Sequence, residues 1–267
     1  MPSATDARHK SIRLDRPPRR IVSLVPSQTE LLAHLGLDET VVGITRFCAR
    51  PGHWRDEKTI VGGTKDVDED TVRALAPDLI LANHEENTRA DVATLSDVAP
   101  VFVTQVQTVT EALDMIRTVG HLTDAAGQTS TLAGKIISRF SRLPDFSPLR
   151  TAYLIWREPY MTVGGDTFIH DVMSWGGFDN AFGDRTRYPE VTLDTLAEMD
   201  LDLLLCSSEP FPFHQKEEFT QELRDALPHT SVEVVDGQPF SWYGPRLLDT
   251  PTYLKELRER LSLPKAA

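Results

Sequence analysis

The sequence predicts an α/β protein made of two Rossmann-like lobes with mostly parallel sheets, joined by a single long backbone helix. Two stretches 124 positions apart, VDEDTVRALAPDLILAN (67–83) and VTLDTLAEMDLDLLLCS (191–207), share six of their seventeen residues. Each reads as a short amphipathic helix, an acidic residue and a β-run. Strand and helix patterns alternate in both halves, which is typical of parallel sheets. Between the halves, residues 110–143 contain no β-run and repeat apolar side chains at helical spacing.

In the first half, β-branched runs predict strands, while capping residues and breakers set the helix ends. Ser27 with Glu30 three positions later reads as a capping box that opens a helix. Asp68 reads as the N-cap of a second helix, which Pro77 ends. The expected strands are 21–25, 41–44, 79–82 and 101–103, and the expected helices are 28–35, 69–76 and roughly 87–96.

The second half restarts with the same order of elements after one long helix. We interpret Asp124–Leu143 as this linking helix, with Ile136 and Phe140 buried along it. The elements expected after it are a strand at 151–156, a helix at 167–175, a strand at 231–235 and a terminal helix at 250–261. The expected domains are an N-terminal lobe (1–123), the linking helix (124–145) and a C-terminal lobe (146–267).

Composition and charge exclude several classes of function. The chain of 267 residues carries a formal net charge of −12, which argues against nucleic-acid binding because nucleic-acid binders need a basic surface. The first twenty residues are polar and lack the apolar core of a secretory signal. We therefore expect a cytoplasmic protein, or a periplasmic or cell-surface one if a leader was removed. Cys48 and Cys206 are expected to stay unpaired, and their spacing is not that of a zinc site.

Aromatic and polar residues gather in the segments that follow predicted strands. Such loops line the ligand crevice of parallel α/β sheets, where aromatic rings can stack on a bulky ligand. Arginines 157, 187 and 246 in these segments could bind carboxylates or phosphates. The alternative is that Trp156, Tyr188 and Trp242 simply fill the cores of the lobes. The segments are RFC (46–48), GGTKD (62–66), NHEEN (83–87), WREPYMTVGGDT (156–167), RTRYPE (185–190), SSEPFPF (207–213) and FSWYGPRLL (240–248).

Evidence for catalysis or a directly bound metal is weak. Cys48 with His53, or Ser207 with Glu209 and His214, could be drawn as catalytic groups, but neither set lies in a nucleophile motif. The sequence HEE at 84–86 could bind a metal, yet the histidines show no metal-site spacing. We therefore expect no enzyme activity, no catalytic cofactor and no metal held directly by side chains.

The ordered motifs resemble one known family. RIVSLVPSQTELLAHLGL, VVGITRFCARPG, VGGTKDVDEDTVRALAPDLILANHEEN, IWREPYMTVGGDTFIHDV, RTRYPEVT and FSWYGPRLL together are similar to the helical-backbone (class III) substrate-binding proteins of ABC importers. The receptors for vitamin B12 are the nearest type, and siderophore and haem receptors are their relatives. The resemblance implies a monomer that binds a metal chelate, cobalamin first, between two lobes. A ferric-siderophore or haem binder, or a cytoplasmic corrinoid- or metal-handling protein or enzyme that reuses the fold, is the alternative.

The resemblance also implies roles for individual residues. One acidic residue per lobe, Asp70 and Asp194, would dock onto the membrane subunits of an ABC importer; otherwise both are helix-end carboxylates that favour the helix dipole. At the positions where B12 receptors carry tryptophans in the first lobe, this chain has Thr64 and Asn83. The full set of expected ligand contacts is Phe47, Thr64, Asn83, Trp156, Tyr160, Tyr188, Phe211, Trp242, Tyr243 and Arg246.

Overall fold

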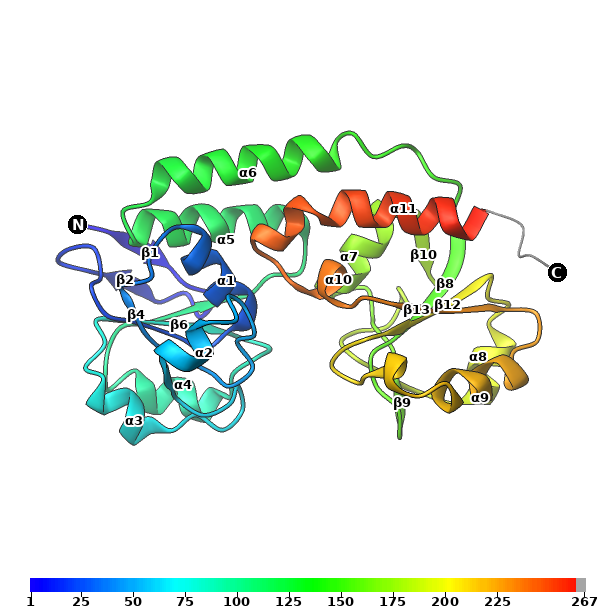
Figure 1. The fold of residues 1–267 in the computed structure, drawn as a ribbon, viewed down its shortest axis with the longest axis horizontal. Coiled ribbons are helices and arrows are strands. Elements are labelled where there is room, and N and C mark those ends of the chain that lie inside the picture. Colours follow the sequence, from blue (N-terminus) through cyan, green and yellow to red (C-terminus); the bar gives the residue numbers. More distant parts are fainter. Residues whose placement is uncertain (263–267) are drawn as a thin grey trace. The chain divides into compact units, whose positions relative to one another are not determined.

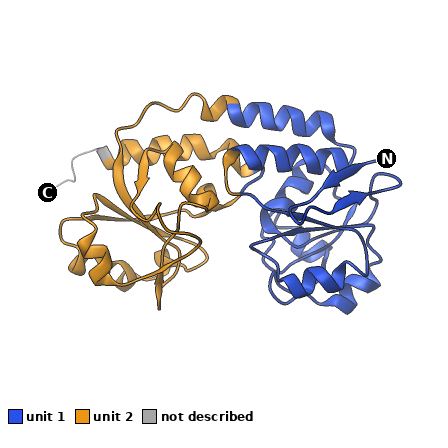
Figure 2. Ribbon diagram, turned by 180° about the vertical axis from the view of Figure 1, so that it is seen from behind, with its two compact units in different colours: residues 1–106, 110–137, 243–245 blue, residues 107–109, 138–242, 246–267 orange. Residues whose placement is uncertain are grey.

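Two parallel sheets, one in each half of the sequence, form the centre of the fold (Figure 1). The computed structural model describes residues 1–262. The chain divides into two compact units (Figure 2). Unit 1 comprises residues 1–106, 110–137 and 243–245, and unit 2 comprises residues 107–109, 138–242 and the chain from Arg246 onward. The predicted α/β class with parallel sheets is confirmed. The finer division at residues 123 and 145 stays a prediction.

The sheet of unit 1 has five parallel strands in the order β5-β4-β3-β6-β7. The strands are β3 (Ile21–Ser23), β4 (Val41–Ile44), β5 (Thr59–Ile60), β6 (Leu79–Asn83) and β7 (Val101–Thr104). The helices that follow them are α1 (Pro26–His34), α2 (Trp54–Glu57), α3 (Glu69–Ala74), α4 (Arg89–Leu95) and α5 (Val109–Leu122). Helix α6 (Ala126–Phe140) runs beside α5 and carries the chain into unit 2 (Figures 1 and 2). The central strands are fully buried, as the long apolar runs predict.

The sheet of unit 2 has four parallel strands in the order β10-β8-β12-β13. These strands are β8 (Leu149–Leu154), β10 (Phe178–Asn180), β12 (Leu203–Ser207) and β13 (Ser231–Val235). A small antiparallel pair, β9 (Tyr160–Met161) and β11 (Glu190–Val191), lies outside the sheet. The helices are α7 (Phe168–Trp175), α8 (Leu193–Glu198), α9 (Glu218–Ala226), α10 (Gln238–Ser241) and α11 (Thr250–Ser262), with 3₁₀ turns η1 (Phe213–Gln215) and η2 (Pro245–Leu248).

The sequence repeat is also a structural repeat. Helix α3 and helix α8 begin and end 124 positions apart, and so do strands β6 and β12. Between helix and strand, both copies place one residue in the left-handed region, Ala76 at φ 43° and Asp200 at φ 48°. The two units therefore reproduce the same helix–turn–strand geometry with different residues at the strained position.

The acidic residue before each strand has the same role in both copies. Asp78 accepts a hydrogen bond from the backbone N–H of Arg20 (2.9 Å), and Asp202 accepts one from that of Arg150 (2.7 Å). The guanidinium of Arg20 donates to the C-cap carbonyl of α3 at 2.7 Å, and the guanidinium of Arg150 donates to the C-cap carbonyl of α8 at 2.8 Å. The aspartate and the arginine together thus join the start of the neighbouring strand to the helix end in each unit.

Several element boundaries differ from the prediction. Ser27 is not the N-cap of α1: the helix begins at Pro26, whose fixed φ suits the first helical position, and no side chain caps it. The linking helix was predicted from residue 124 to 143. It runs from 126 to 140, and Asp124 at φ 60° separates it from α5. The expected burial of Ile136 and Phe140 is confirmed, and so is the Asp68 cap of α3.

Strand β8 ends at Leu154 rather than at the predicted Trp156, which leaves the tryptophan in the following loop. An N-terminal hairpin, β1 (Ser3–Thr5) with β2 (Ser11–Arg13), was not predicted. Its turn reaches the edge strand β7, because the N–H of Ala7 donates to the carbonyl of Val103 (2.8 Å). The hairpin turn therefore meets a sheet edge that would otherwise be open to pairing.

Candidate ligand-binding loops

The loops after the carboxyl ends of the strands contain the only exposed phenylalanine and tryptophan of residues 1–262. Phe47 follows β4 in unit 1 and is 53% exposed, and Trp156 follows β8 in unit 2 and is 40% exposed. Most other large aromatic rings of the chain are buried in the cores. Parallel α/β sheets bind ligands at the carboxyl ends of their strands, and an exposed aromatic ring there can stack on a ligand.

In unit 1, the ring of Phe47 lies beside an arginine that is itself paired with an aspartate. The guanidinium of Arg46 lies 5.2 Å from the centre of that ring. Arg46 also forms an ion pair of 2.6 Å with Asp66 in the loop after β5. Phe47 therefore lies beside a neutralised cation, and its ring stays open to solvent.

Thr64 and Asn83, expected as ligand contacts, are buried. The side-chain oxygen of Asn83 accepts the N–H of Glu85 (2.8 Å), and its amide donates to the hydroxyl of Thr104 (3.1 Å). Asn87 donates to the carbonyl of Thr64 (3.0 Å) and accepts the N–H of Asn83 (2.9 Å). These bonds tie the loops after β5 and β6 together. The roles of Thr64 and Asn83 as direct ligand contacts stay predictions; the structure shows that they shape the loops.

In unit 2, a cluster of phenylalanines supports Trp156. The ring of Phe211 meets Trp156 edge to face, with centroids 5.8 Å apart and planes at 72°. Behind it, Phe211 packs on Phe213 at 4.8 Å and on Phe219 at 5.1 Å. Phe211 is half-buried, so Trp156 contacts a supported ring while it keeps much of its own surface in solvent.

An ion pair with helix α9 fixes the residues next to Trp156. Arg157 pairs with Glu222 at 2.8 Å, and its guanidinium lies 5.1 Å from the ring centre of Phe219. The hydroxyl of Tyr160 donates to the same carboxylate (3.0 Å). The hydrogen bond from Arg157 lowers the pKa of Glu222, whereas burial raises the pKa of Tyr160 to about 12. Glu222 was not predicted as a site residue, because its partners Arg157 and Tyr160 lie more than sixty positions away in the sequence.

Trp242 differs from Trp156 because it is buried, at 8% exposure. Its indole N–H donates to the carboxylate of Glu209 (2.8 Å), which also accepts the hydroxyl of Ser241 (2.9 Å). Burial raises the pKa of Glu209 above the ordinary value, although both hydrogen bonds act in the opposite direction. The indole edge of Trp242 is thus already committed to a protein partner.

The remaining predicted contacts lie in two segments. Tyr188 is half-buried beneath the guanidinium of Arg187 (5.6 Å), in a loop that approaches Gly164 closely. The N–H of Gly164 donates to the carbonyl of Arg187 (2.8 Å), and a Cβ at Gly164 would lie 2.4 Å from a neighbouring carbonyl oxygen. Tyr243 is buried in the short segment that belongs to unit 1, and Arg246 is half-buried in η2.

The two predicted docking residues occupy equivalent, exposed places. Asp70 lies in the first turn of α3 behind the Asp68 cap, and Asp194 lies in the first turn of α8 behind the Thr192 cap. Both side chains are exposed.

The side chains considered above as possible catalytic groups make structural contacts instead. Cys48 is buried against the hydroxyl of Thr29 (3.1 Å), and burial raises the pKa of its thiol, the opposite of nucleophile activation. The hydroxyl of Ser207 donates to the backbone carbonyl of Glu209 (2.6 Å), while the carboxylate of Glu209 binds elsewhere. Both cysteines are free, as expected, and both are buried. Among residues 1–262, no three histidine, cysteine or acidic side chains gather as a metal site, and no helix has the length and apolarity of a membrane span.

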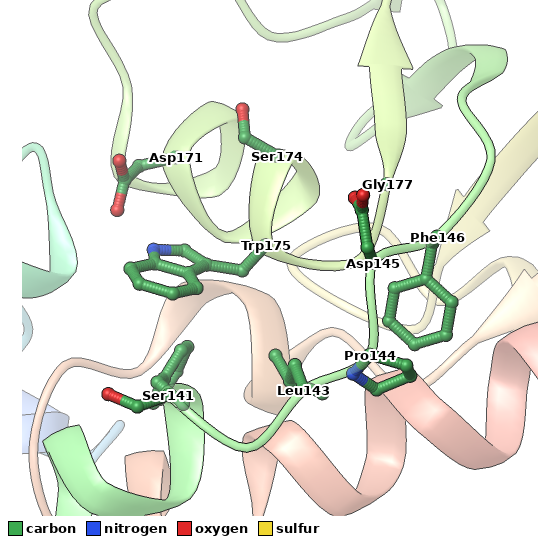
Figure 3. Close-up of a pocket in the computed structure, with 10 residues that line it drawn as sticks. Ser141, Leu143, Pro144, Asp145, Phe146, Asp171, Ser174, Trp175 and Gly177 are labelled. Carbon is green, nitrogen blue, oxygen red and sulfur yellow. The ribbon is translucent and has the colours of Figure 1, made fainter.

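A surface hollow of about 520 Å³ lies elsewhere in unit 2 (Figure 3). Its walls come from the end of α6, the segment before β8 and the end of α7, including Leu143, Phe146 and Trp175. These residues lie at the amino ends of β8 and β10, whereas ligands of parallel α/β sheets bind at the carboxyl ends. The hollow is therefore not the candidate site.

Comparison with known proteins places the chain in a family. The profile of the periplasmic binding protein family matches residues 21–230. The chain is 24% identical over 265 residues to the uncharacterized ABC transporter substrate-binding lipoprotein YvrC of Bacillus subtilis, covering 94% of this chain and 83% of that protein. It is 23% identical to the vitamin B12-binding protein of Vibrio cholerae, covering 90% of each. A periplasmic haem-binding protein from Pseudomonas aeruginosa shares the fold, with a TM-score of 0.79 and 17% identity over 94% of this chain and 96% of that one. The chain belongs to the periplasmic binding protein family and is a substrate-binding protein of the ABC-importer type.

Proposed function

We propose that the protein binds a metal chelate without transforming it and delivers it to an ABC importer, with a corrinoid as the first candidate. The observation that carries this proposal is the exposure of Phe47 and Trp156, one in each unit, at the carboxyl edges of the two sheets. Each ring can stack on a flat macrocycle, and each is held by charged or aromatic neighbours.

The choice of a corrinoid over haem rests on the relatives. The relative named as a vitamin B12-binding protein matches along nearly the whole chain, whereas the haem-binding protein is similar at the level of the fold. Haem and ferric siderophores are the second candidates, because the same aromatic surfaces would stack on them.

The ligand can be identified by its colour. Purified protein is mixed in turn with cyanocobalamin, haemin and a ferric siderophore and passed over a sizing column. We expect the absorbance of cyanocobalamin to elute with the protein. If haemin or the siderophore coelutes instead, the ligand class changes while the binding function stands. If none coelutes, the proposed function is wrong.

The exposed aromatic rings can then be tested one at a time. Stacking contributes about 1–3 kcal/mol per aromatic side chain in base-binding proteins, so Phe47→Ala and Trp156→Ala should each weaken binding about tenfold or more. Trp175→Ala is the matched control, because that tryptophan lines the hollow at the other edge of the sheet. Full affinity in both folded loop variants would show that these rings do not contact the ligand.

We also propose that Asp70 and Asp194 dock onto the importer, which places the protein on the outer side of the membrane. Matching exposed carboxylates on α3 and α8 suit a membrane partner with two similar subunits. The double variant Asp70→Lys/Asp194→Lys should bind ligand normally but fail to stimulate transport in vesicles that contain the importer. Asp97→Lys/Asp145→Lys is the control with the same change in charge, because both residues are exposed and neither lies on α3 or α8. Normal stimulation by the first variant would leave the two aspartates as helix-end carboxylates.

A further inference from the structure

Glu209 connects two segments that carry predicted ligand contacts, the loop after β12 with Phe211 and the end of α10 with Trp242. It follows β12, and its carboxylate oxygen Oε1 accepts two hydrogen bonds from the end of α10, one from Ser241 (2.9 Å) and one from the indole of Trp242 (2.8 Å). Trp242 is the last residue of unit 2 before the chain enters unit 1. The carboxylate thus fixes the orientation of a large ring at this junction of the chain.

The backbone of Glu209 is fixed as firmly as its side chain. The hydroxyl of Ser207 donates to the carbonyl of Glu209 (2.6 Å) and accepts its N–H (3.3 Å). That hydroxyl also accepts a hydrogen bond from Tyr153 (3.1 Å), a ring with no exposed surface. Glu209 is therefore anchored to the core of the sheet.

The same short loop supports the exposed ring. Two residues after Glu209, the N–H of Phe211 donates to the carbonyl of Ile155 (3.2 Å), next to Trp156. The ring of Phe211 then meets Trp156 edge to face at 5.8 Å. Trp156 is 40% exposed, so burial alone does not fix its orientation, and the contact with Phe211 restricts it further.

We propose that Glu209 is a positioning residue for the ligand site: its carboxylate holds Trp242 and, through the loop to Phe211, sets the orientation of Trp156 that the ligand meets. A ring that is fixed before binding loses less freedom when the ligand arrives, so a preformed ring raises affinity. The inference rests on the proposed function for its binding measurement only.

The structural part can be tested without a ligand. The full-length protein has four tryptophans, and their indole N–H signals are resolved by NMR and assigned with single Trp→Phe variants. Glu209→Leu should move the Trp242 and Trp156 signals, and Glu209→Gln, which keeps an acceptor oxygen, should restore both. Glu217→Leu, an exposed acidic residue eight positions on, is the control and should move neither. Unmoved signals in Glu209→Leu, or equal shifts in the Gln variant, would overturn the proposal.

A second variant covers the case in which Glu209→Leu does not fold. A Cβ at Gly237 would lie 2.4 Å from the hydroxyl of Ser207 and 2.7 Å from the Cγ of Glu209. Gly237→Ala should therefore displace Glu209 without removing its charge, and move the Trp242 and Trp156 signals. If both signals stay in place, the proposal is refuted.

Binding completes the test. The affinities for cyanocobalamin and haemin are measured by quenching of tryptophan fluorescence. Glu209→Leu should weaken binding of whichever probe the native protein binds by about tenfold, and Glu209→Gln should restore it. Unchanged affinity despite moved signals would refute the link to the ligand. If the native protein binds neither probe, the proposed ligand class fails, and the NMR result still decides whether Glu209 positions the two rings.

Discussion

Two adjacent isoleucines on helix α6 allow the packing of that helix to be tested with a built-in control. Ile136 has no exposed surface, whereas Ile137 is 37% exposed. Replacement by alanine removes the same three carbons at both positions and gives the same gain in helix propensity of a few tenths of a kcal/mol. At Ile136 the lost burial and the cavity should cost about 3 kcal/mol, and at Ile137 the cost should stay below about 1 kcal/mol.

The difference can be measured by thermal unfolding followed by circular dichroism. For a chain of this size, about 2–4 °C are lost per kcal/mol, so Ile136→Ala should lower Tm by roughly 6–12 °C. Ile137→Ala should lower it by no more than a few degrees. Urea titrations of both variants provide an independent measure, read for each transition if the two units unfold separately. Equal shifts for the two variants would refute the packing of α6 described above.

Three further predictions concern the scaffold. Asp78→Ala and Asp202→Ala should each lower the free energy of unfolding by about 1–2 kcal/mol in urea titrations, because each removes hydrogen bonds to a charged acceptor; a large effect at only one position would contradict the equivalence of the repeats. Thr192→Ala should cost about 1 kcal/mol by loss of the α8 cap, and Thr192→Ser should retain most of it. The folded state raises the pKa of Glu209 because the residue is buried. The stability that its protonation provides is therefore complete below the ordinary glutamate pKa and is lost as pH rises through the raised value. Glu209→Gln should abolish this decline, and parallel pH profiles of the free energy of unfolding in variant and native protein would refute the prediction.

The strands and helices of the scaffold could be predicted because the patterns that indicate them lie within short stretches of sequence. Apolar runs predicted the buried strands β3, β6 and β12, and the repeat predicted that two α/β units share one geometry. Boundaries failed where one residue overrode the pattern. Pro26 began α1 before the apparent capping box, and the left-handed Asp124 separated the linking helix from α5.

The sequence predicts which loops form the candidate site, but it does not predict the contacts of the individual side chains in those loops. The sequence places aromatic residues after strands, yet it does not show that Trp156 stays exposed while Trp242 is buried. The two rings also have different partners, Phe211 for Trp156 and Glu209 for Trp242, and both partners lie far away in the chain. Likewise, Asn83 reads as a free polar residue, and only the fold shows that its side chain is used within its own loop.

The repeat extends beyond the strands into the loops that follow them, and the two copies of these loops differ after the first turn. Asn83 and Ser207 end β6 and β12 at equivalent positions, and each accepts the N–H of a glutamate two residues on, Glu85 at 2.8 Å and Glu209 at 3.3 Å. The same turn thus opens both loops. After it, the carbonyl of Glu85 accepts the ammonium of Lys65, whereas the carboxylate of Glu209 holds a tryptophan. The shared scaffold brings equivalent residues to the same edge of each sheet, and the side chains beyond the common turn make the loop after β6 polar and the loop after β12 aromatic.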